Sequence, residues 1–345
     1  MFTCFNAETA DATWRLAAEA LLNGGGWQMQ NGRSGQAREI LHCALTIENP
    51  RARWVLSRKP GINPASAIVE SFWILAGRND AKLVNFWNPA LPRFAGSTTY
   101  YPGAYGHRLR KHYELDQIES AFKALCAHPD GRQVMLQIWD PRTDMPFPDG
   151  TPAAADIPCN ICSLIKVRDG RLEWLQILRS NDLFRGLPYD FVQFTILQEV
   201  IAGWLGLELG TYNHVTDSLH LYETDMGILS IANEPLVKTY GASLALPKKD
   251  FECILADFMD ILERLASADL TCVEFDRICR APDLPNSYHN LLLIIAADSA
   301  RRRTWQAEQQ WAENNCTEPV LRQAWKAWVN NRSPNSPVMK KYSII

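Results

Sequence analysis

Apolar and polar positions follow a strand-like order most clearly in the middle of the chain. Residues 160–168 and 171–178 together are rich in Ile, Leu and Val, and Asp169-Gly170 between them is a strong signal for a tight hairpin turn. Shorter segments of the same kind cover residues 133–139 and 211–216. The pattern therefore predicts a sheet built mainly from the middle of the chain.

Apolar residues at helical spacing predict helices on both sides of this sheet. Two of these helices have clear boundary signals. Asn63-Pro64 begins one that ends near Gly77, and Pro188 suits the first turn of a long apolar helix that reaches about Leu205. The other helices are expected over residues 11–22, 116–127, 251–266, 288–297, 300–314 and 318–330.

A strand-rich middle between helical ends predicts an α+β architecture, with a mixed sheet and flanking helices. We expect residues 1–235 to form the core and residues 236–345 to form a helical C-terminal extension that packs on the same domain. Residues 83–106 are rich in Pro, Gly and aromatic side chains, which predicts a long irregular segment of the kind that often carries function.

The composition is that of an ordinary globular protein. Of 345 residues, 47% are hydrophobic and 21% are charged, and the net charge is −3 without a basic block, which argues against a nucleic-acid partner. The N-terminus lacks the apolar segment of a signal peptide, and the longest strongly apolar stretch, Leu291–Ala297, is too short to cross a bilayer. These features predict a cytoplasmic protein without a membrane partner.

The nine cysteines are scattered, which in a reducing compartment indicates free thiols. Cys159 follows Pro158 and directly precedes a predicted strand. It could be a small buried apolar residue, or half of a redox or zinc pair with Cys162. Residues three apart on a strand face opposite sides, and no second Cys or His pair has zinc spacing, so the sequence predicts no metal site.

The run from Leu178 to Phe191, LRSNDLFRGLPYDF, holds a second group of candidate residues. Arg179 offers a planar guanidinium and Ser180 a hydroxyl, and both are good partners for a phosphate. An Arg-Ser pair at the end of a strand is equally typical of a solvated turn. Its neighbours along the chain are what favour a binding site.

Several segments, taken in order, resemble those of the thymidylate synthase family, which includes deoxycytidylate and cytidylate hydroxymethylases. Their joint order is far more specific than any single segment, and the resemblance covers roughly residues 30–225. It implies a thymidylate synthase-like fold with a catalytic core over residues 1–235. The matching segments are Val69–Trp73, Gly103–Arg108, Arg132 with Trp139-Asp140, Pro158-Cys159, Arg179–Asp182, Gly186–Asp190 and His220–Tyr222.

The resemblance implies that the Cys159 thiolate adds to C6 of a pyrimidine, so that C5 can attack the methylene carbon of 5,10-methylenetetrahydrofolate. Arg179 is implied to lie beside this sulfur and the phosphate, and a positive neighbour is what a thiolate needs. Glu70 resembles the family's proton-relay carboxylate, and a carboxylate within an apolar helix is costly to bury without a purpose. Tyr105, in the Tyr-Gly loop, and Asp190 complete the expected catalytic residues.

The same resemblance implies a site for a pyrimidine nucleoside monophosphate. Asp190 stands where thymidylate synthases have Asn and cytidylate hydroxymethylases have Asp. A carboxylate only accepts hydrogen bonds, so it suits a base edge that donates twice, as cytosine protonated at N3 does. The dipole of the following helix is an alternative reason for an acid here. The expected substrate-binding residues are Arg33, Arg132, Arg179, Ser180, Asn181, Asp190, His220 and Tyr222.

Other parts of the family's site match this chain less evenly. His220 and Tyr222 are implied to bind the sugar 3′-hydroxyl, and Arg33 and Arg132 the phosphate. The resemblance also implies a homodimer in which Arg132 reaches the partner's site, although Gln133 replaces the second arginine of that pair. The residues implied to face the folate are Trp87, Asp182, Gly186 and Tyr189.

The principal prediction is transfer of a one-carbon unit to C5 of CMP or dCMP, with a hydroxymethyl product. Thymidylate synthesis from dUMP is the alternative within the same family. Two further alternatives are a nucleotide-binding protein without turnover and a thiol or zinc module built on Cys159 and Cys162.

Overall fold

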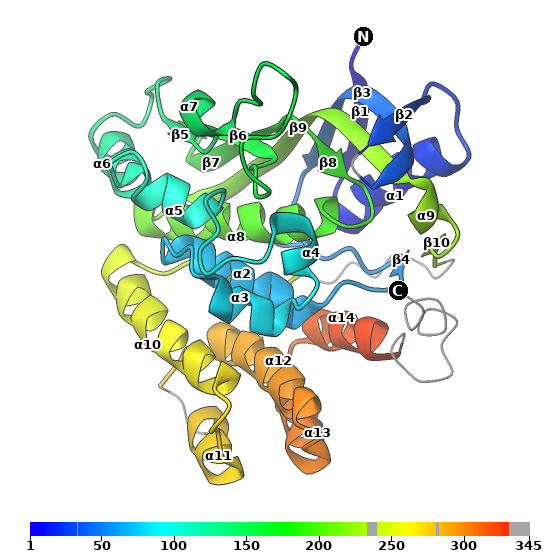
Figure 1. Cartoon of the computed structure of the whole chain (residues 1–345). Helices are drawn as coiled ribbons and strands as arrows, with labels where there is room; N and C mark the ends of the chain where they lie inside the picture. The colour runs from blue at the N-terminus through cyan, green and yellow to red at the C-terminus, as the bar shows by residue number, and fades with distance from the viewer. Residues whose placement is uncertain (33, 233–239, 281–282, 331–345) are drawn as a thin grey trace.

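A mixed sheet, a layer of helices beneath it and a group of C-terminal helices follow one another through the molecule (Figure 1). The structure is a computed structural model that describes residues 1–32, 34–232, 240–280 and 283–330. Within these residues, none of the helices combines the length and apolar character needed to cross a membrane.

The main sheet has the strand order β1-β3-β9-β7-β6-β5, with β2 added beside β3 and β8 beside β9. Its longest strands are β3 (Gly35–Ile47) and β9 (Glu208–Tyr222), which pair antiparallel. Because β9 runs parallel to β7 on its other side, the sheet is mixed, as predicted. The remaining strands are β1 (Thr3–Ala7), β2 (Gln28–Gly32), β5 (Met135–Gln137), β6 (Asn160–Arg168), β7 (Arg171–Leu178) and β8 (Asn181–Asp182).

Helix α8 (Leu187–Leu205) packs on β7 and β9 and carries α2 (Pro64–Leu75) on its other side. Both helices are apolar on most faces because each lies between two layers, and almost all of their side chains are buried. Pro188 occupies the first turn of α8, and Gly206, in the left-handed conformation with φ 65°, ends it. The predicted boundaries of this helix are therefore confirmed.

The C-terminal helices continue the core through α2. Phe72 of α2 packs against Phe258 of α10 (Lys248–Ala266) with ring centroids 4.3 Å apart, and against Tyr288 of α12 (Asn286–Arg302) at 6.1 Å. Helix α14 (Pro319–Val329) also contacts α2. The extension thus shares one hydrophobic core with the rest of the chain, and the expected boundary at residue 235 falls among residues that the structure does not describe.

Several predicted elements differ from the structure. The N-terminal strands β1, β2 and β3 were not predicted, and residues 83–106 hold short helices rather than a single irregular segment. The helix expected over 300–314 is interrupted near Thr304, whose φ is 60°, and α11 was not predicted. The other elements are α1 (Ala10–Leu22), α3 (Ala81–Trp87), α4 (Leu91–Ala95), α5 (Tyr105–Arg110), α6 (Gln117–Ala127), α7 (Pro141–Asp144), α9 (Glu223–Met226), α11 (Cys272–Arg280), α13 (Gln306–Asn315), β4 (Arg58–Lys59) and β10 (Ser230–Ile231).

Candidate active site

The open end of the β6–β7 hairpin brings Cys159 and Arg179 together. Asn160 pairs with Leu178, so the residues just outside the pair lie opposite each other, and Arg179 N donates to the Cys159 carbonyl at 3.0 Å. The Arg179 guanidinium donates to the carbonyl of Pro158 at 3.0 Å, and its Nη2 lies 3.9 Å from Cys159 Sγ. A half-exposed thiol beside a fixed cation is favoured as a thiolate.

The same hairpin separates the two cysteines of the CxxC sequence. Cys159 precedes β6 and is half-exposed, whereas Cys162 lies within β6 and is buried, so that burial raises the pKa of its thiol. Within the described residues, no group of three or more His, Cys, Asp or Glu side chains is arranged to hold a metal ion. The geometry thus makes Cys159 the more reactive thiol of the two.

Asp190 lies in the first turn of α8, buried with 7% exposure, and both its oxygens accept hydrogen bonds from amides. Asn181 Nδ2 donates to Oδ2 at 2.9 Å, and Asn160 Nδ2 donates to Oδ1 at 3.4 Å. Burial raises the pKa of Asp190 to about 7, although these two bonds lower it in part. The carboxyl group therefore titrates near neutral pH.

A chain of buried amides holds Asn160 and Asn181 in place. Gln176 of β7 donates to Asn160 Oδ1 at 2.8 Å, which turns the Asn160 amide nitrogen toward Asp190. Asn181 Nδ2 also lies 3.0 Å from Nε2 of His214. Burial lowers the pKa of His214 to about 3, so its ring is neutral and can accept at Nε2.

Glu70 and Tyr105 approach Asp190 from two other helices. Burial, together with the nearby carboxylates of Asp190 and Asp156, raises the pKa of Glu70 to about 7. Burial raises the pKa of Tyr105 well above its ordinary value, with contributions from Asp190 and Cys159, while a hydrogen bond with Asn160 lowers it. Helices α2, α5 and α8 thus bring two carboxyl groups and a phenol together near the cysteine.

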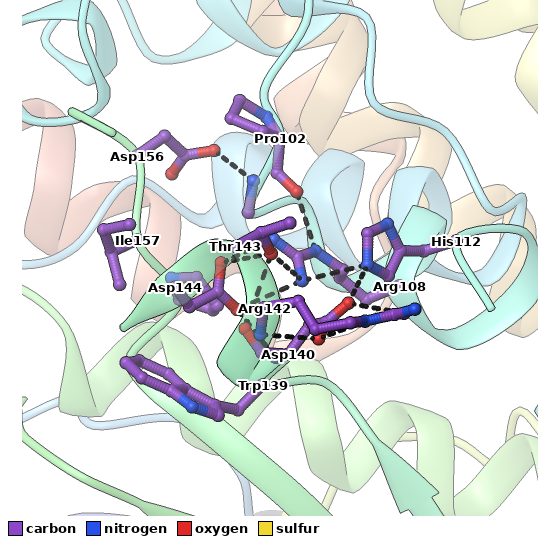
Figure 2. Close-up of polar contacts among 12 residues, drawn as sticks. Pro102, Arg108, His112, Trp139, Asp140, Arg142, Thr143, Asp144, Asp156 and Ile157 are labelled. Carbon is purple, nitrogen blue, oxygen red and sulfur yellow. Dashed lines mark hydrogen bonds and ion pairs between the residues drawn. The ribbon is translucent and has the colours of Figure 1, made fainter. Parts of the chain in front are cut away.

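Polar contacts anchor the segment between Pro102 and Arg108 to Asp144 and Asp156, which precede Cys159 in the chain (Figure 2). Asp156 Oδ2 accepts from Gly103 N at 2.7 Å, and a Cβ on Gly103 would lie 3.0 Å from Asp156. Three residues after Tyr105, the fully buried Arg108 forms a two-point ion pair with Asp144 at 2.7 and 3.1 Å. These bonds fix α5 against the loop that leads to Cys159.

On the other side of Arg179, Ser180 Oγ lies 3.4 Å from Nδ1 of His220. The His220 ring meets the edge of Tyr222 with centroids 5.1 Å apart. Gly32, at the end of β2, lies so close to Tyr222 that a Cβ there would be 2.9 Å from its hydroxyl oxygen. Three predicted sugar and phosphate ligands therefore lie near one another, at the ends of β7 and β9.

Neither of the two further arginines expected at the phosphate adds to this cluster within the described residues. Arg33 lies outside the described residues, although Gly32 and Gly35 on either side pair in the β2–β3 hairpin. Arg132 is exposed before β5. Arg179 is therefore the guanidinium that the described residues place beside both Cys159 and Ser180.

Three of the expected folate-facing residues, Asp182, Gly186 and Tyr189, lie at or near the start of α8, whereas Trp87 lies on α3. Asp182 Oδ1 accepts from the backbone N–H groups of Phe184 and Arg185, both at 2.8 Å, and burial raises its pKa. The Tyr189 hydroxyl accepts from Asn63 N at 3.1 Å. Trp87 ends α3 with only 1% exposure, and its indole N–H has no acceptor among the described residues. Trp87 thus lies behind the surface rather than on it.

A family model for thymidylate synthase matches residues 20–256 of this chain. The chain belongs to the thymidylate synthase family. It is 32% identical over 302 residues to the deoxyuridylate hydroxymethyltransferase of Bacillus phage SP01, covering 84% of this chain and 73% of that protein. The deoxyuridylate hydroxymethyltransferase of Pseudomonas phage M6 is 31% identical over 209 residues, covering 57% of this chain and 58% of that protein. A putative thymidylate synthase of Methanothermobacter thermautotrophicus is 26% identical over 221 residues, covering 63% of this chain and 92% of that protein.

Membership of the thymidylate synthase family confirms the predicted α+β fold class and the predicted enzyme class. The protein transfers a one-carbon unit to a pyrimidine nucleotide, with 5,10-methylenetetrahydrofolate as its cosubstrate. The family match ends at residue 256, within α10.

The predicted site omitted several polar residues that the fold brings to Asp190 and Glu70. Asn160 directly follows Cys159, and its place next to the expected nucleophile was the available sequence signal. Asp156 shares the short segment DIPC with Cys159, which is a weaker signal. Gln176 and His214 lie on distant strands, and nothing in their local sequence connects them to Asp190.

Proposed function

We propose that this thymidylate synthase family enzyme hydroxymethylates C5 of CMP or dCMP, with Asp190 selecting the base. The observation that carries the proposal is the position of this carboxyl group. It is buried, and each oxygen is oriented by an amide donor of the protein. Each oxygen of the ionised group retains a lone pair for the base, so the two oxygens would accept from N3–H and the N4 amine of cytosine.

The pKa of Asp190 supports this pairing. Since its pKa is about 7, the free site holds a mixture of the neutral and ionised forms at physiological pH. The neutral form can pass its proton to N3 as Cys159 adds to C6, which leaves two acceptors facing two donors. A uracil edge would offer one donor and one acceptor, leaving a buried group unpaired against the carboxylate, and such mismatches discriminate by about 10⁴-fold.

In the proposed mechanism, the other catalytic residues act around this base. Cys159, held beside Arg179, supplies the thiolate that adds to C6. Glu70 exchanges protons near the new bond at C5, since its pKa of about 7 lets it act as acid or base. Tyr105 stays protonated at neutral pH and would position Asn160 and the ring. 5,10-Methylenetetrahydrofolate supplies the methylene carbon that becomes the hydroxymethyl group.

Residues at the ends of β7 and β9 would hold the sugar phosphate. Arg179 and Ser180 offer a guanidinium and a hydroxyl to the phosphate, while His220 and Tyr222 would bind the sugar. Asn181 would act by orienting Asp190, and not only by contacting the base itself. A homodimer that adds Arg132 from the partner subunit, and a contribution from Arg33, remain part of the proposal.

The folate would lie against Asp182, Gly186 and Tyr189, and the layer that holds the buried Trp87 would support this surface from behind. We call Tyr189 and Trp87 the folate wall. Asp182 fits this use because both of its hydrogen bonds from backbone N–H groups fall on Oδ1, while Oδ2 lies 3.9 Å from Arg185 Nε. A half-buried carboxylate oxygen of this kind suits the N–H donors of a pteridine.

The relatives support the hydroxymethyl outcome and favour a second candidate for the base. Three similar phage proteins are named deoxyuridylate hydroxymethyltransferases, which points to water rather than hydride in the last step. The same names favour dUMP as the substrate. A neutral Asp190 would offer one donor and one acceptor, which matches uracil, so the second candidate is dUMP hydroxymethylation.

Mass spectrometry of the products from CMP, dCMP and dUMP with 5,10-methylenetetrahydrofolate tests the proposal. We expect a hydroxymethyl product from a cytidine nucleotide, none from the Cys159→Ala variant, and a shift toward uracil nucleotides in Asp190→Asn. The Cys162→Ala variant is the matched control and should retain turnover. A wild-type product from dUMP alone, together with an unchanged base preference in Asp190→Asn, would overturn the assignment of cytosine.

A further inference from the structure

A buried carboxylate in the C-terminal extension is connected to both parts of the folate wall. Asp298 lies on α12, fully buried, outside the residues that match the family model. Arg301 donates to its Oδ1 at 2.7 and 2.9 Å, and Arg302 Nε donates to Oδ2 at 2.9 Å. A buried charge is costly unless it is paired and hydrogen-bonded, and here it is both.

The first connection runs through Asn63 to Tyr189. Asn63 Nδ2 donates to Asp298 Oδ2 at 3.4 Å, while its Oδ1 accepts from Ser66 N at 3.3 Å and caps α2. Its backbone N–H donates to the Tyr189 hydroxyl at 3.1 Å. Asp298 therefore orients the side chain of Asn63, which caps α2 and whose backbone N–H contacts Tyr189. Helix α2 also carries Glu70.

The second connection runs through Arg302 to Trp87. Arg302 Nη2 donates to the carbonyl of Trp87 at 2.7 Å, at the C-terminal end of α3 where backbone carbonyls lack helical partners. Because the Trp87 indole N–H has no acceptor among the described residues, side-chain hydrogen bonding does not fix this tryptophan. Packing and the Arg302 contact with its carbonyl hold it instead.

We propose that Asp298 is a positioning residue for the folate wall, acting through Asn63 on Tyr189 and through Arg302 on Trp87. The inference rests on the proposed function, because it takes Tyr189 to face the cosubstrate and the buried Trp87 to support that surface from behind. It assigns a role to the helical extension, which sets the spacing of α2, α3 and the start of α8 from behind. The nucleotide side, built on Arg179 and Asp190, has no contact with this carboxylate among the described residues.

The test compares full-length wild type with Asp298→Asn and Arg302→Met. Binding of tetrahydrofolate and of CMP is measured separately by calorimetry, and amide hydrogen exchange is followed over residues 62–72 and 84–90. We expect both variants to weaken tetrahydrofolate binding about tenfold, as for loss of one charge-assisted hydrogen bond, and to change CMP binding by less than about twofold. Exchange should become faster in both segments for Asp298→Asn, and over residues 84–90 for Arg302→Met.

Asn290→Ala is the matched control on the same helix. Asn290 is buried, and its Oδ1 accepts from Thr317 N at 2.6 Å and Glu318 N at 3.3 Å, which ties α12 only to the segment before α14. This variant should lower thermal stability without changing tetrahydrofolate binding. A folded Asp298→Asn protein with unchanged binding and exchange would overturn the proposal, as would an equal loss of binding in Asn290→Ala.

Failure of the proposed function and failure of the Asp298 proposal give different results. If wild type binds CMP but not tetrahydrofolate, the proposed function fails, whereas the exchange data still report whether Asp298 holds α2 and α3. If Asp298→Asn does not fold, Arg302→Met tests the Trp87 connection alone, because Asp298 then keeps Arg301 and Asn63 as partners.

Discussion

Replacing Asp190 by Asn should stabilise the protein increasingly as the pH rises. Burial raises the pKa of Asp190 from an ordinary value of 3.8 to about 7, so the folded state holds this proton more tightly than the unfolded state does. The free energy of unfolding of wild type therefore falls as the pH rises from about 4 to about 7. Each pKa unit corresponds to about 1.4 kcal/mol, so the full loss is about 4 kcal/mol.

The Asp190→Asn variant cannot ionise at this position and escapes that loss. Between pH 5 and pH 8, its unfolding free energy should gain about 3 kcal/mol relative to wild type. Asn160 and Asn181 both donate to the carboxyl group of Asp190. In the variant, the NH₂ group of the new amide would face one of these donors, at a cost of about 1 kcal/mol. This cost does not vary with pH. The decisive quantity is therefore how the gap between the unfolding free energies of the variant and of wild type changes with pH.

Urea denaturation of both proteins at pH 5, 6, 7 and 8 measures this gap. Glu70 acts in the same direction, since the Asp190 charge contributes to its raised pKa and is lost in the variant. Asp257→Asn, at an exposed position of α10, serves as the control and should show a constant gap. A constant gap for Asp190→Asn would mean that the folded protein ionises Asp190 below pH 5, and the reasoning about its proton would be refuted.

Three further substitutions test the other parts of the site. Arg179→Gln should slow alkylation of Cys159 by iodoacetamide at pH 7 about tenfold, because a guanidinium 3.9 Å from Sγ favours the thiolate; equal rates would contradict this. Glu70→Gln should lower turnover about 100-fold and remove a transition near pH 7 from the pH–rate profile, while CMP binding is retained; an unchanged profile would exclude Glu70 as the titrating group. Asp144→Asn should lower the free energy of unfolding by about 3 kcal/mol in urea, since it leaves Arg108 buried with a neutral partner; a loss under about 1 kcal/mol would contradict the importance of this ion pair.

Local signals in the sequence were sufficient for the regular elements next to the site. Asp169-Gly170 defined the hairpin, and its strands span the predicted residues 160–168 and 171–178. Strand β3 was missed because its apolar residues do not coincide with its buried positions. Leu41 is exposed, whereas Glu39 is buried and bonded to Ser218. Such a strand is defined by its neighbours in the sheet rather than by its own residues.

Some features of the candidate site also followed from the sequence, whereas others required the fold. The order of the motifs identified the family, and the resemblance implied that Arg179 lies beside Cys159, which agrees with the pairing of Asn160 with Leu178. Residues near each other in the chain, such as Ser180 and Asn181, followed from the same motif. These conclusions depended on the types and the order of residues along the chain, which a sequence carries in full.

Tertiary structure alone decided the protonation and the support of the site. Asp190 titrates near pH 7 because α8 is buried between the sheet and α2, which raises the pKa of this carboxyl group more than the hydrogen bonds from amides of two strands lower it. Asp298 reaches Asn63 across more than 200 residues of chain. Burial and long-range hydrogen bonds depend on which distant segments share a core, and no local pattern of residues specifies that.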